Sequence, residues 1–373
     1  MKKYALITGS SGLIGSQSVN FFISKGYNVV GIDNDMRSYF FGSSASTLNT
    51  KKTLRSNYKE LFQSLDIDIR NYNELEKVFK LYNFEIVIHT AAQPSHDWAV
   101  KEPLTDFTVN AVGTMNLLEL TRLYIPKATF IFTSTNKVYG DRPNYNYETN
   151  EIDDYNLLIK EHETRYEGIN RITGELISIN ETMSIDKCKH SIFGASKVAA
   201  DIMVQEYGKY FGINTVVFRG GCLTGPNHAG TELHGFLSHL IKCIVNDKHY
   251  TIYGYKGKQV RDNIYANDLV EMFWEYHKNP KPGEVYNAGG GRENSISILE
   301  AIEEVNNILV EEGLNRWSNY TISENSREGD HVWYITDYSK FKSHYPEWSI
   351  KTSLKDILKM ITYKEINEKF CRI

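Results

Sequence analysis

The fold of this chain is decided by the stretch Tyr4-Ala5-Leu6-Ile7-Thr8-Gly9-Ser10-Ser11-Gly12-Leu13-Ile14-Gly15. An apolar run is followed directly by the spacing G-x-x-G-x-x-G and then by a helix-period segment. The glycines permit a tight turn, close approach of the backbone to a pyrophosphate and close packing of helix against strand, and the helix N-terminus supplies free N–H groups. The stretch therefore predicts the first strand, phosphate-binding turn and first helix of a dinucleotide-binding fold.

Two acidic strand ends refine this prediction. Asp33 ends the second apolar run, where a carboxylate can accept both hydrogen bonds of an adenosine ribose diol and would repel a 2′-phosphate, which favours NAD over NADP. Asp68 and Ile69 close the third run, where they can meet the adenine edge or serve as an ordinary strand end. The predicted NAD-binding set is Gly9, Ser11, Gly12, Leu13, Ile14, Gly15, Asp33, Asn34, Asp68, Ile69, Ala91, Asn110 and Lys197.

Short apolar runs alternate with amphipathic segments along the first part of the chain. The runs are Tyr4–Thr8, Asn28–Asp33, Ser64–Asp68, Glu85–Thr90, Ala128–Ser134 and Asn214–Arg219. This alternation is the βαβ pattern, and the fully apolar centre of the fourth run indicates a central strand covered on both faces. We predict an α/β fold, a Rossmann-type doubly wound parallel sheet with a smaller C-terminal substrate-binding lobe.

The regular pattern weakens where the substrate side of a cleft is usually built. The stretches without a sustained period are Met36–Glu60, Asp141–His190 and Leu223–Asp262. We predict that residues 1–222 form mainly the NAD-binding domain, with an insertion at 141–190. Residues 223–373 then form mainly the substrate lobe, with about 263–289 returning to the first domain.

Composition limits the partners. The net charge of −4 comes without a basic run, so nucleic acid and membrane surfaces are not expected partners. No stretch has the apolar length of a membrane span, and no signal peptide precedes the first strand. The four cysteines, Cys188, Cys222, Cys243 and Cys371, form no C-x-x-C pair, which favours a reducing cytoplasm.

The segment Phe193-Gly194-Ala195-Ser196-Lys197 keeps all but the first residue of the Tyr-x-x-x-Lys signature of short-chain dehydrogenases. The chain resembles the extended short-chain dehydrogenase/reductase family of nucleotide-sugar enzymes across roughly its whole length, and within that family it looks most like the CDP-paratose (CDP-tyvelose) 2-epimerases. The matching motifs are Ser134-Thr135-Asn136-Lys137-Val138-Tyr139-Gly140-Asp141, Glu163-Thr164-Arg165-Tyr166, Val216-Val217-Phe218-Arg219 and Gly257-Lys258-Gln259-Val260-Arg261-Asp262.

The resemblance implies an NAD that is reduced and reoxidised within one turnover, and a nucleotide-diphosphate-sugar between two lobes. It implies that Thr135 bonds the reacting hydroxyl, that Lys197 holds the nicotinamide ribose and that Asn110 shapes the cofactor floor. Arg261 and Arg327 correspond to diphosphate ligands, which suits bidentate guanidinium geometry, although Arg261 could instead form a surface ion pair with Asp262. The predicted substrate-binding set is His96, Thr135, Asn136, Arg261 and Arg327, and a homodimer or higher homo-oligomer is expected.

Asn136 and Lys137 disfavour a dehydratase. Sugar 4,6-dehydratases of this family carry an Asp-Glu pair directly after the catalytic Ser or Thr, because elimination of water needs an acid and a base. An amide and an ammonium occupy those positions here.

Phe193 removes the usual proton acceptor. Loss of a general base typically costs about 10²- to 10⁴-fold in rate, roughly 3 to 5.5 kcal/mol of barrier. Either another residue is the base, or the chain is a weakened or engineered variant, or it binds ligands without turnover. The leading substitute is His96, just past the fourth strand, against the alternative of a loop histidine packed beside Trp98. Cys188, His190 and Cys222 are weaker candidates.

Three histidines, His228, His234 and His239, crowd the insertion after the sixth strand. Without a C-x-x-C pair nearby they do not predict a zinc site, and we expect no metal. The leading functional hypothesis is an NAD-dependent nucleotide-sugar epimerase, with C2 and CDP-paratose implied by the resemblance. The alternatives are a 4-epimerase, net oxidation of a sugar nucleotide, and a catalytically silent NAD and sugar-nucleotide binding protein.

Overall fold

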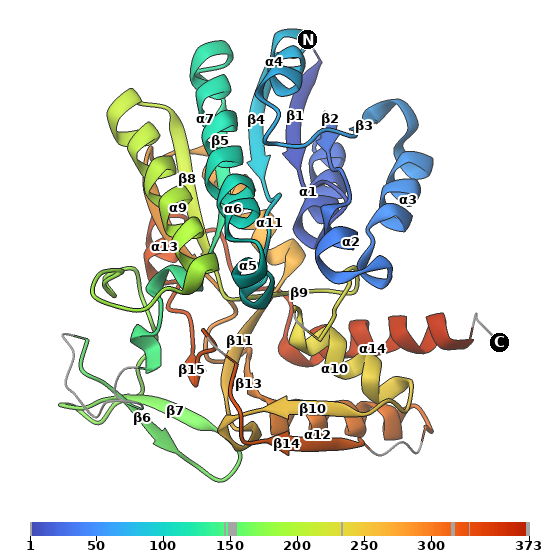
Figure 1. Cartoon of the computed structure of the whole chain (residues 1–373), viewed down its shortest axis with the longest axis vertical. Helices are drawn as coiled ribbons and strands as arrows, with labels where there is room; N and C mark the ends of the chain where they lie inside the picture. Colours follow the sequence, from blue (N-terminus) through green and yellow to red (C-terminus); the bar gives the residue numbers. More distant parts are fainter. Residues whose placement is uncertain are drawn as a thin grey trace.

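Seven parallel strands form the central sheet, in the order β12-β8-β5-β4-β1-β2-β3 (Figure 1). The computed structural model describes residues 2–144, 147, 155–232, 234–314, 318–327 and 329–370. The sheet strands are β1 (Lys3–Thr8), β2 (Tyr27–Ile32), β3 (Phe62–Leu65), β4 (Phe84–His89), β5 (Thr129–Thr135), β8 (Asn214–Gly220) and β12 (Glu284–Ala288). The predicted Rossmann-type sheet is thus confirmed, and β4 lies at its centre as expected.

The third strand is the least accurate of the sequence-based assignments. It was expected at Ser64–Asp68, but β3 ends at Leu65, and Asp68 lies in the turn that follows. β3 is an edge strand that pairs only with β2 among the described strands, so its burial pattern is weak and its end is poorly marked in sequence.

Helices cover both faces of the sheet. Those of the sheet domain are α1 (Leu13–Ser24), α2 (Met36–Phe41), α3 (Leu48–Tyr58), α4 (Tyr72–Leu81), α5 (His96–Lys101), α6 (Pro103–Phe107), α7 (Gly113–Tyr124), α9 (Ser191–Phe211), α11 (Ala266–Lys278) and α13 (Ser339–His344). The expectation that Met36–Glu60 lacks regular structure is wrong, because it contains α2 and α3. α3 buries a single residue, Leu54, which explains its weak periodicity.

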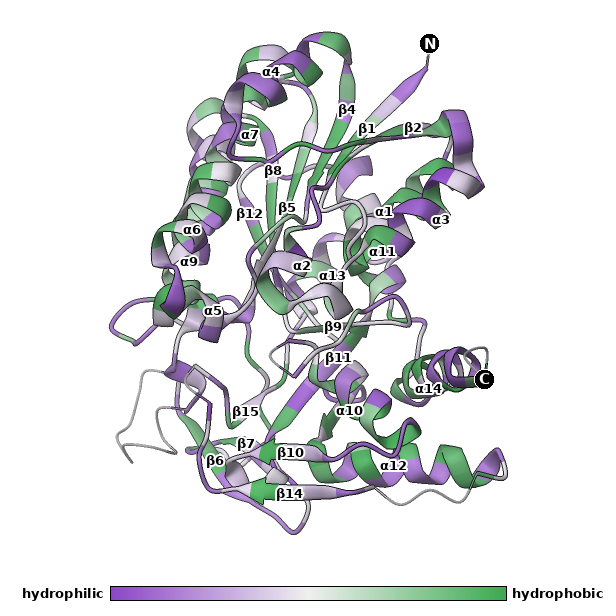
Figure 2. Ribbon diagram, turned by 45° about the vertical axis from the view of Figure 1, so that its right-hand side comes forward, coloured by the Kyte–Doolittle hydropathy of each residue, from purple (hydrophilic) through white to green (hydrophobic). Residues whose placement is uncertain are grey.

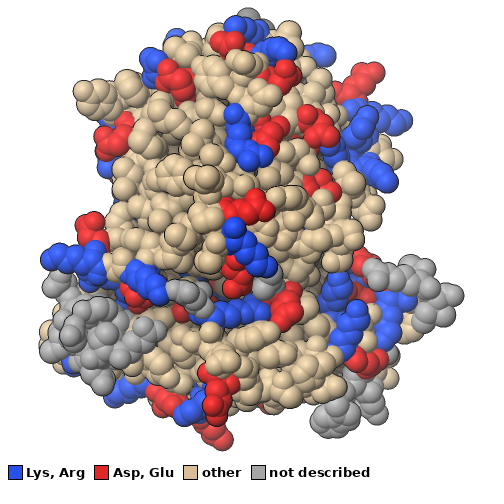
Figure 3. Space-filling view, viewed as in Figure 1, with Lys and Arg blue, Asp and Glu red and all other residues tan. Residues whose placement is uncertain are grey.

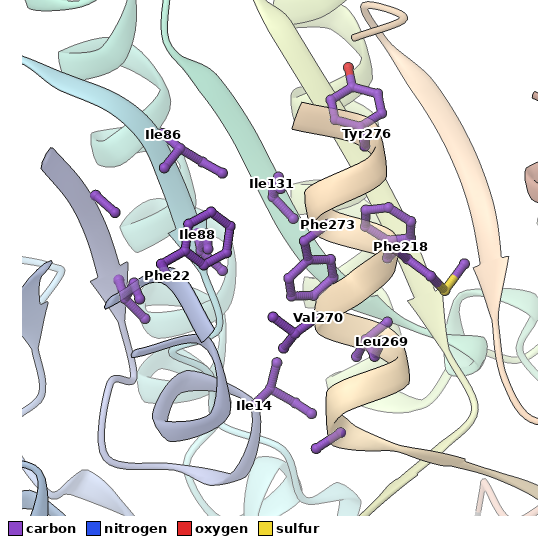
Figure 4. Close-up of a cluster of buried hydrophobic side chains, with 14 of the residues drawn as sticks. Ile14, Phe22, Ile86, Ile88, Ile131, Phe218, Leu269, Val270, Phe273 and Tyr276 are labelled. Carbon is purple, nitrogen blue, oxygen red and sulfur yellow. The ribbon is translucent and has the colours of Figure 1, made fainter. Parts of the chain in front are cut away.

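Two separate cores result from this doubly wound arrangement. On one face, α1 and α11 pack on the sheet, with Phe22, Ile88 and Phe273 among the buried side chains (Figure 4). On the other face, α4, α7 and α9 cover the same strands. The strands are accordingly apolar along most of their length (Figure 2).

A second lobe lies below the carboxyl ends of the strands in the view of Figure 1. Its strands are β9 (Cys222–Thr224), β10 (Tyr250–Tyr253), β11 (Val260–Tyr265), β13 (Ser295–Ser297), β14 (Tyr320–Ser323) and β15 (Trp333–Tyr334), and its helices are α10 (Phe236–Val245), α12 (Ile298–Glu311) and α14 (Leu354–Phe370). α10, α12 and α14 share one apolar core. β11 is its central strand, pairing with β9, β13 and β15.

The insertion before α9 contains a hairpin of β6 (Leu157–Glu161) and β7 (Tyr166–Asn170), which packs on β15. Residues 145, 146 and 148–154 of this predicted insertion lie outside the described residues. Phe341, Tyr345 and Trp348 join the core around α11, so a segment far down the chain also packs on the sheet. The domain boundaries themselves stay a prediction.

Candidate active site

One cavity of about 690 Å³ opens at the carboxyl ends of the parallel strands and is lined from both lobes. At one end lie the glycine turn and Asp33, and at the other lie Arg261 and Arg327. Phe193, Lys197 and Thr135 line the part between them. Ligands of open α/β sheets bind at this edge, where the strand order reverses, here between β1 and β4. The predicted cofactor and substrate residues therefore meet around one space.

The glycine turn has the geometry that a dinucleotide needs. Gly9 has a φ of +65°, and a Cβ at Gly15 would lie 2.0 Å from the Gly9 carbonyl oxygen, so neither position admits a larger residue. Gly12 caps α1 without a side-chain hydrogen bond, and no acidic residue occupies the first turn. The free N–H groups and the positive end of the helix dipole fit a pyrophosphate. Gly12, Leu13 and Ile14 line the cavity, whereas Ser11 and Gly15 lie behind its surface.

Asp33 is held by backbone amides at the end of β2. Its carboxylate accepts hydrogen bonds from Ser11 N at 2.8 Å and from Asp35 N at 2.9 Å. Burial raises the pKa of Asp33, and these two bonds oppose that shift. The carboxylate lines the cavity and retains acceptor capacity for a ribose diol.

Asp68 is less free than the sequence suggests. Arg70 donates to its two oxygens, from Nε at 3.0 Å and from Nη2 at 2.6 Å, and Asn34 Nδ2 lies 3.3 Å away. Although burial would raise it, the Arg70 guanidinium holds the pKa of Asp68 below its usual range. Asn34, Asp68, Ile69 and Ala91 all line the cavity.

Asn110 lies behind the surface of the cavity. It is buried and is not one of the cavity-lining residues. Its amide joins the Gln93 loop to α9: Oδ1 accepts from Gln93 N at 3.0 Å, and Nδ2 donates to Gln93 O and Ser196 Oγ, each at 3.0 Å. A direct contact of Asn110 with the cofactor stays a prediction.

Phe193 and His96 lie against each other in the middle of the cavity wall. The two rings are edge to face with centroids 4.9 Å apart, and only 6% of Phe193 is exposed. His96 Nδ1 is 2.8 Å from Ser191 Oγ. Burial, with a contribution from Lys137, lowers the pKa of His96 to about 3. His96 is therefore close to the position of the missing phenol, but it is a weak proton acceptor at neutral pH.

Lys197 sits one helical turn after Phe193 and faces β5. Its Nζ donates to Thr133 O at 2.9 Å and lies 4.2 Å from the centre of the Phe132 ring. Burial lowers the pKa of Lys197 to about 8.

Thr135, Asn136 and Lys137 follow one another at the end of β5 and all line the cavity. Thr135 Oγ1 accepts from Lys137 N at 3.2 Å. The Lys137 ammonium donates to Gly329 O at 2.9 Å and lies 3.9 Å from Asp330 Oδ1. Lys137 was excluded from the predicted site set because the sequence argument used it only against a dehydratase.

Arg261 is paired, but not with the neighbour that sequence suggested. Its guanidinium bonds Asp330, and Nη1 donates to Val260 O at 2.8 Å, so the alternative considered for Arg261, a surface ion pair with Asp262, is wrong. Asp262 is buried and accepts from Gly291 N at 3.0 Å. Strand alternation explains this, because adjacent residues of β11 point to opposite faces.

Arg327 lies at the outer end of the cavity. It stacks over Tyr253 at 4.2 Å and donates to Glu232 O at 2.6 Å. Its sequence neighbour Glu328 is outside the described residues.

Of the three weaker candidates for the base, one lines the cavity and two do not. Cys222 lines the cavity, and burial raises the pKa of its thiol to about 12. Cys188 and His190 contact each other at 3.4 Å beside Gly140, and neither is among the residues that line the cavity.

The three histidines of the insertion line another part of the cavity. His228 Nε2 and His234 Nδ1 are 3.4 Å apart, whereas His239 Nε2 contacts Cys243 Sγ at 3.7 Å. Within the described residues, no group of three or more His, Cys, Asp or Glu side chains is arranged to hold a metal ion. Cys371 lies outside the described part of the chain.

Known proteins are similar to this chain over most of its length. The family profile for GDP-mannose 4,6 dehydratase matches residues 6–156, and that for the NAD dependent epimerase/dehydratase family matches residues 172–289. The chain is 32% identical over 361 residues to CDP-paratose 2-epimerase of Salmonella typhi, covering 94% of this chain and 96% of that protein.

Solved structures show the same architecture. The crystal structure of UDP-glucuronic acid 4-epimerase from Bacillus cereus, in complex with UDP-glucuronic acid and NAD, has a TM-score of 0.75 at 25% identity and covers 98% of this chain and 99% of that one. A tyrosine-to-phenylalanine mutant of that enzyme, in complex with UDP-4-deoxy-4-fluoro-glucuronic acid and NAD, has a TM-score of 0.74 at 26% identity, with the same coverage.

The doubly wound sheet and the shared cavity define a dinucleotide-dependent enzyme with a second, substrate-binding lobe. The chain belongs to the NAD-dependent epimerase/dehydratase family of nucleotide-sugar enzymes, within the short-chain dehydrogenases/reductases, and NAD is its cofactor. Among the described helices, none combines the length and apolar character that crossing a membrane requires.

Proposed function

We propose that this chain is an NAD-dependent epimerase of the CDP-paratose 2-epimerase type, which inverts C2 of a CDP-linked deoxysugar. The 32% identity over nearly the whole chain to the Salmonella typhi enzyme supports this substrate. The continuity of the cavity from the glycine turn to Arg261 and Arg327 is the observation that carries the proposal, because a hydride can pass only between ligands held in one space.

Each predicted site residue has a proposed task in this reaction. When bound, NAD supplies an acceptor that takes hydride from the sugar and gives it back. The glycine turn would hold its pyrophosphate, Asp33 its adenosine ribose and Lys197 its nicotinamide ribose, with Asn34, Asp68, Ile69 and Ala91 around the adenosine. Ser11 supports this set through its amide bond to Asp33, and Asn110 through its bonds beneath the floor.

The substrate is proposed to lie between the two lobes. Thr135 and Asn136 would bond the reacting hydroxyl and its neighbour, and His96 would contact the sugar beside Phe193. Arg261 and Arg327 would bind the diphosphate, for which Arg261 must share its guanidinium with Asp330. Lys137 and Asn136 in place of a carboxylate pair support epimerisation over dehydration.

NMR of the ring protons tests this proposal. Purified protein would be incubated with NAD and, in separate tubes, CDP-paratose and UDP-, GDP- and dTDP-sugars. We expect inversion at C2 of CDP-paratose and no net accumulation of NADH. Conversion of none of the sugars by protein that binds NAD would reject the proposal.

Phe193 favours a second candidate function, a binding protein that holds NAD and a sugar nucleotide without turnover. The retained Lys197, Thr135 and Arg261 argue against it, since a silent protein needs no proton-handling or hydride-positioning groups. Isothermal titration of CDP-paratose into the NAD-loaded protein, together with the NMR assay, separates the two: the silent protein binds the sugar nucleotide and leaves its spectrum unchanged.

Other redox outcomes on the same scaffold are 4-epimerisation and net oxidation. Inversion at C4 in the NMR assay would identify the first. A stoichiometric rise in absorbance at the NADH maximum would identify the second, because an epimerase returns its hydride within each turnover.

We also propose a homodimer formed through α7 and α9, which lie side by side on one face of the sheet domain (Figure 1). These helices expose apolar side chains to solvent in the single chain, an arrangement that favours a partner surface. They are Met115, Leu123, Ile202, Tyr210 and Phe211. Light scattering is expected to give twice the chain mass, and Tyr210→Glu to give the monomer. Localisation in the cytoplasm stays a sequence-based prediction.

A further inference from the structure

The backbone of Lys137 is held beside Thr135. Lys137 lies on the short 3₁₀ helix η4 (Asn136–Tyr139), which begins where β5 ends, and its backbone N–H is bonded to Thr135 Oγ1. Only 16% of its side chain is exposed, and that part lines the cavity. The amine therefore belongs to the wall on which the proposed function puts the reacting hydroxyl.

Neighbouring groups compensate the charge and the hydrogen-bond donors of this ammonium only in part. An ammonium has three N–H donors, and within the described residues one hydrogen bond is formed, to Gly329 O. The nearest carboxylate is Asp330, 3.9 Å away, and its same oxygen is already bonded by Arg261. The titratable and charged groups that face the amine are Asp330, Arg261, Cys222, His96 and His331.

A series of contacts links the Lys137 side chain to Phe193, which stands at the place of the missing phenol. Gly329, whose carbonyl accepts from Lys137, packs so closely on His96 that a Cβ there would lie 2.7 Å from Nδ1. The His96 ring in turn contacts Phe193. The chain of contacts Lys137, Gly329, His96, Phe193 thus spans a short section of one wall.

Among the titratable groups of that wall, Lys137 has the most suitable proton affinity. Burial lowers its pKa to about 8, against an opposing effect of Asp330 and with support from Arg261. At pH 7 about a tenth of such an amine is neutral. The pKa of His96 is about 3 and that of Cys222 is about 12, so both are poorly matched to proton transfer near neutrality. Lys197 has a similar pKa, but its ammonium is bonded to β5 on the cofactor side.

We propose that the Lys137 amine is the proton acceptor for the sugar hydroxyl in place of the phenol absent at Phe193; this assignment rests on the proposed epimerase function. The O–H bond breaks and its proton joins the Lys137 nitrogen. The electrons of the C–H bond leave as hydride for the nicotinamide, and the C–O bond becomes C=O. When hydride returns to the opposite face, the Lys137 ammonium gives its proton back to the oxygen. No proton or electron is gained or lost over the turnover.

Variants of Lys137 test the assignment. Lys137→Gln and Lys137→Arg are both expected to lower kcat on CDP-paratose by about 10²- to 10⁴-fold, since an amide cannot accept the proton and a guanidinium does not release its own. Their dissociation constants for NAD should stay within about threefold of wild type, which also verifies folding. Lys355→Gln, on an exposed pair with Glu311 far from the cavity, is the matched control and should turn over normally.

Two further measurements separate proton transfer from a structural role. The kcat/KM of wild type should rise with pH to a plateau above about pH 8, and this limb should be absent from the residual activity of Lys137→Gln. Added methylamine should restore part of the activity of Lys137→Ala but none of that of Lys137→Arg.

A readout that needs no turnover uses the wild-type protein. Competitive labelling of amines with acetic anhydride across pH, read by mass spectrometry, should give Lys137 a titration midpoint near pH 8. If wild type and Lys137→Gln are both fully active, the assignment of Lys137 is overturned and the proposed function is not. Wild type that converts no sugar nucleotide overturns the proposed function, and the assignment with it.

Discussion

The cofactor side and the catalytic wall of the cavity differ in how they hold their ligands. On the proposed cofactor side, recognition would depend on backbone geometry: the turn at Gly9 to Gly15, the open end of α1 and the amides that orient Asp33. On the proposed catalytic wall, the chemistry would depend on single side-chain atoms, and the ring of Phe193 stands where the resemblance implies one of them. Backbone geometry tolerates little substitution, whereas a proton acceptor can be supplied by any side chain that reaches the same point.

The outer surface and the catalytic wall of the cavity differ in how their charges are arranged. Acidic and basic side chains are mixed over the outer face shown in Figure 3. Inside the cavity, Lys137, Arg261 and Asp330 form a compact, partly buried group beside neutral His96. Although burial would raise it, Arg261 and Lys137 hold the pKa of Asp330 below its usual range. Proton affinity on the catalytic wall is therefore set by burial and by these neighbours together.

Acid should destabilise the protein through histidines that are buried in the neutral form. Burial lowers the pKa of His89, His96 and His228 to about 3. The unfolded chain takes up these protons below about pH 6.5 and the folded chain does not, so stability is complete above pH 6.5 and falls as the pH approaches 3. At pH 5 each of these histidines should lower the free energy of unfolding by about 2 kcal/mol relative to its value above pH 6.5.

Equilibrium urea unfolding at pH 7.5 and pH 5 measures this loss. His96→Gln and His228→Gln should each reduce the pH dependence by about the share of one histidine, and His89→Gln on the cofactor side should do the same. An unfolding free energy that is equal at the two pH values would contradict the burial of these neutral rings.

On the cofactor side, Gly15→Val should be strongly disruptive. Its Cβ would lie 2.0 Å from the Gly9 carbonyl, so the turn must open, at a cost of about 3 kcal/mol. We expect a lower melting temperature and NAD affinity reduced by more than about 100-fold. Gly26→Asn is the control, because no atom lies within 4 Å of its Cβ and asparagine tolerates its positive φ. Unchanged NAD binding by Gly15→Val would show that the turn does not hold the cofactor.

Asp33→Ala should weaken NAD binding by about 10- to 100-fold, because hydrogen bonds to a charged acceptor contribute about 1.5 to 3 kcal/mol. Isothermal titration with NAD and with NADP measures the two affinities. The ratio of the NAD affinity to the NADP affinity should be smaller for Asp33→Ala than for wild type. Asp66→Ala, on the exposed segment after β3, is the matched control. If Asp33→Ala binds NAD as wild type does, the ribose is held elsewhere.

The smallest effect on kcat is expected for Phe193→Tyr, although Phe193 is the residue of the sequence that argues most strongly against activity. If Lys137 is the proton acceptor, Phe193→Tyr should change kcat by less than about threefold, because the added phenol duplicates an existing function. An increase of 10²-fold or more would instead identify the natural chain as a weakened tyrosine-type enzyme. The NMR assay on CDP-paratose measures both outcomes.

The sequence predicted the parts of the site that depend on local spacing. The glycine turn, Asp33 and the Phe193-to-Lys197 segment each lie within one strand-helix unit, where a fixed period determines which side chains face the cavity. The central strands were equally readable, because burial on both faces makes them continuously apolar.

The remaining features depend on contacts between distant segments. Arg261 pairs with Asp330, 69 positions later. Strand alternation argues against the adjacent Asp262 as its partner, but no local rule identifies Asp330. Lys137 gains its low pKa from burial beneath the Gly329 segment, which a one-dimensional pattern does not contain. Its position directly after Thr135 and Asn136 was the one signal that could have placed it in the site set.

The central claim is that hydride leaves C2 and returns to it, held by NAD in between, although residue 193 cannot exchange a proton. CDP-paratose deuterated at C2, incubated with the NAD-loaded protein in ordinary water and followed by NMR and mass spectrometry, tests it directly. We predict an inverted C2 that keeps its deuterium. Loss of the deuterium to solvent, or a C2 that is never inverted, would contradict the account.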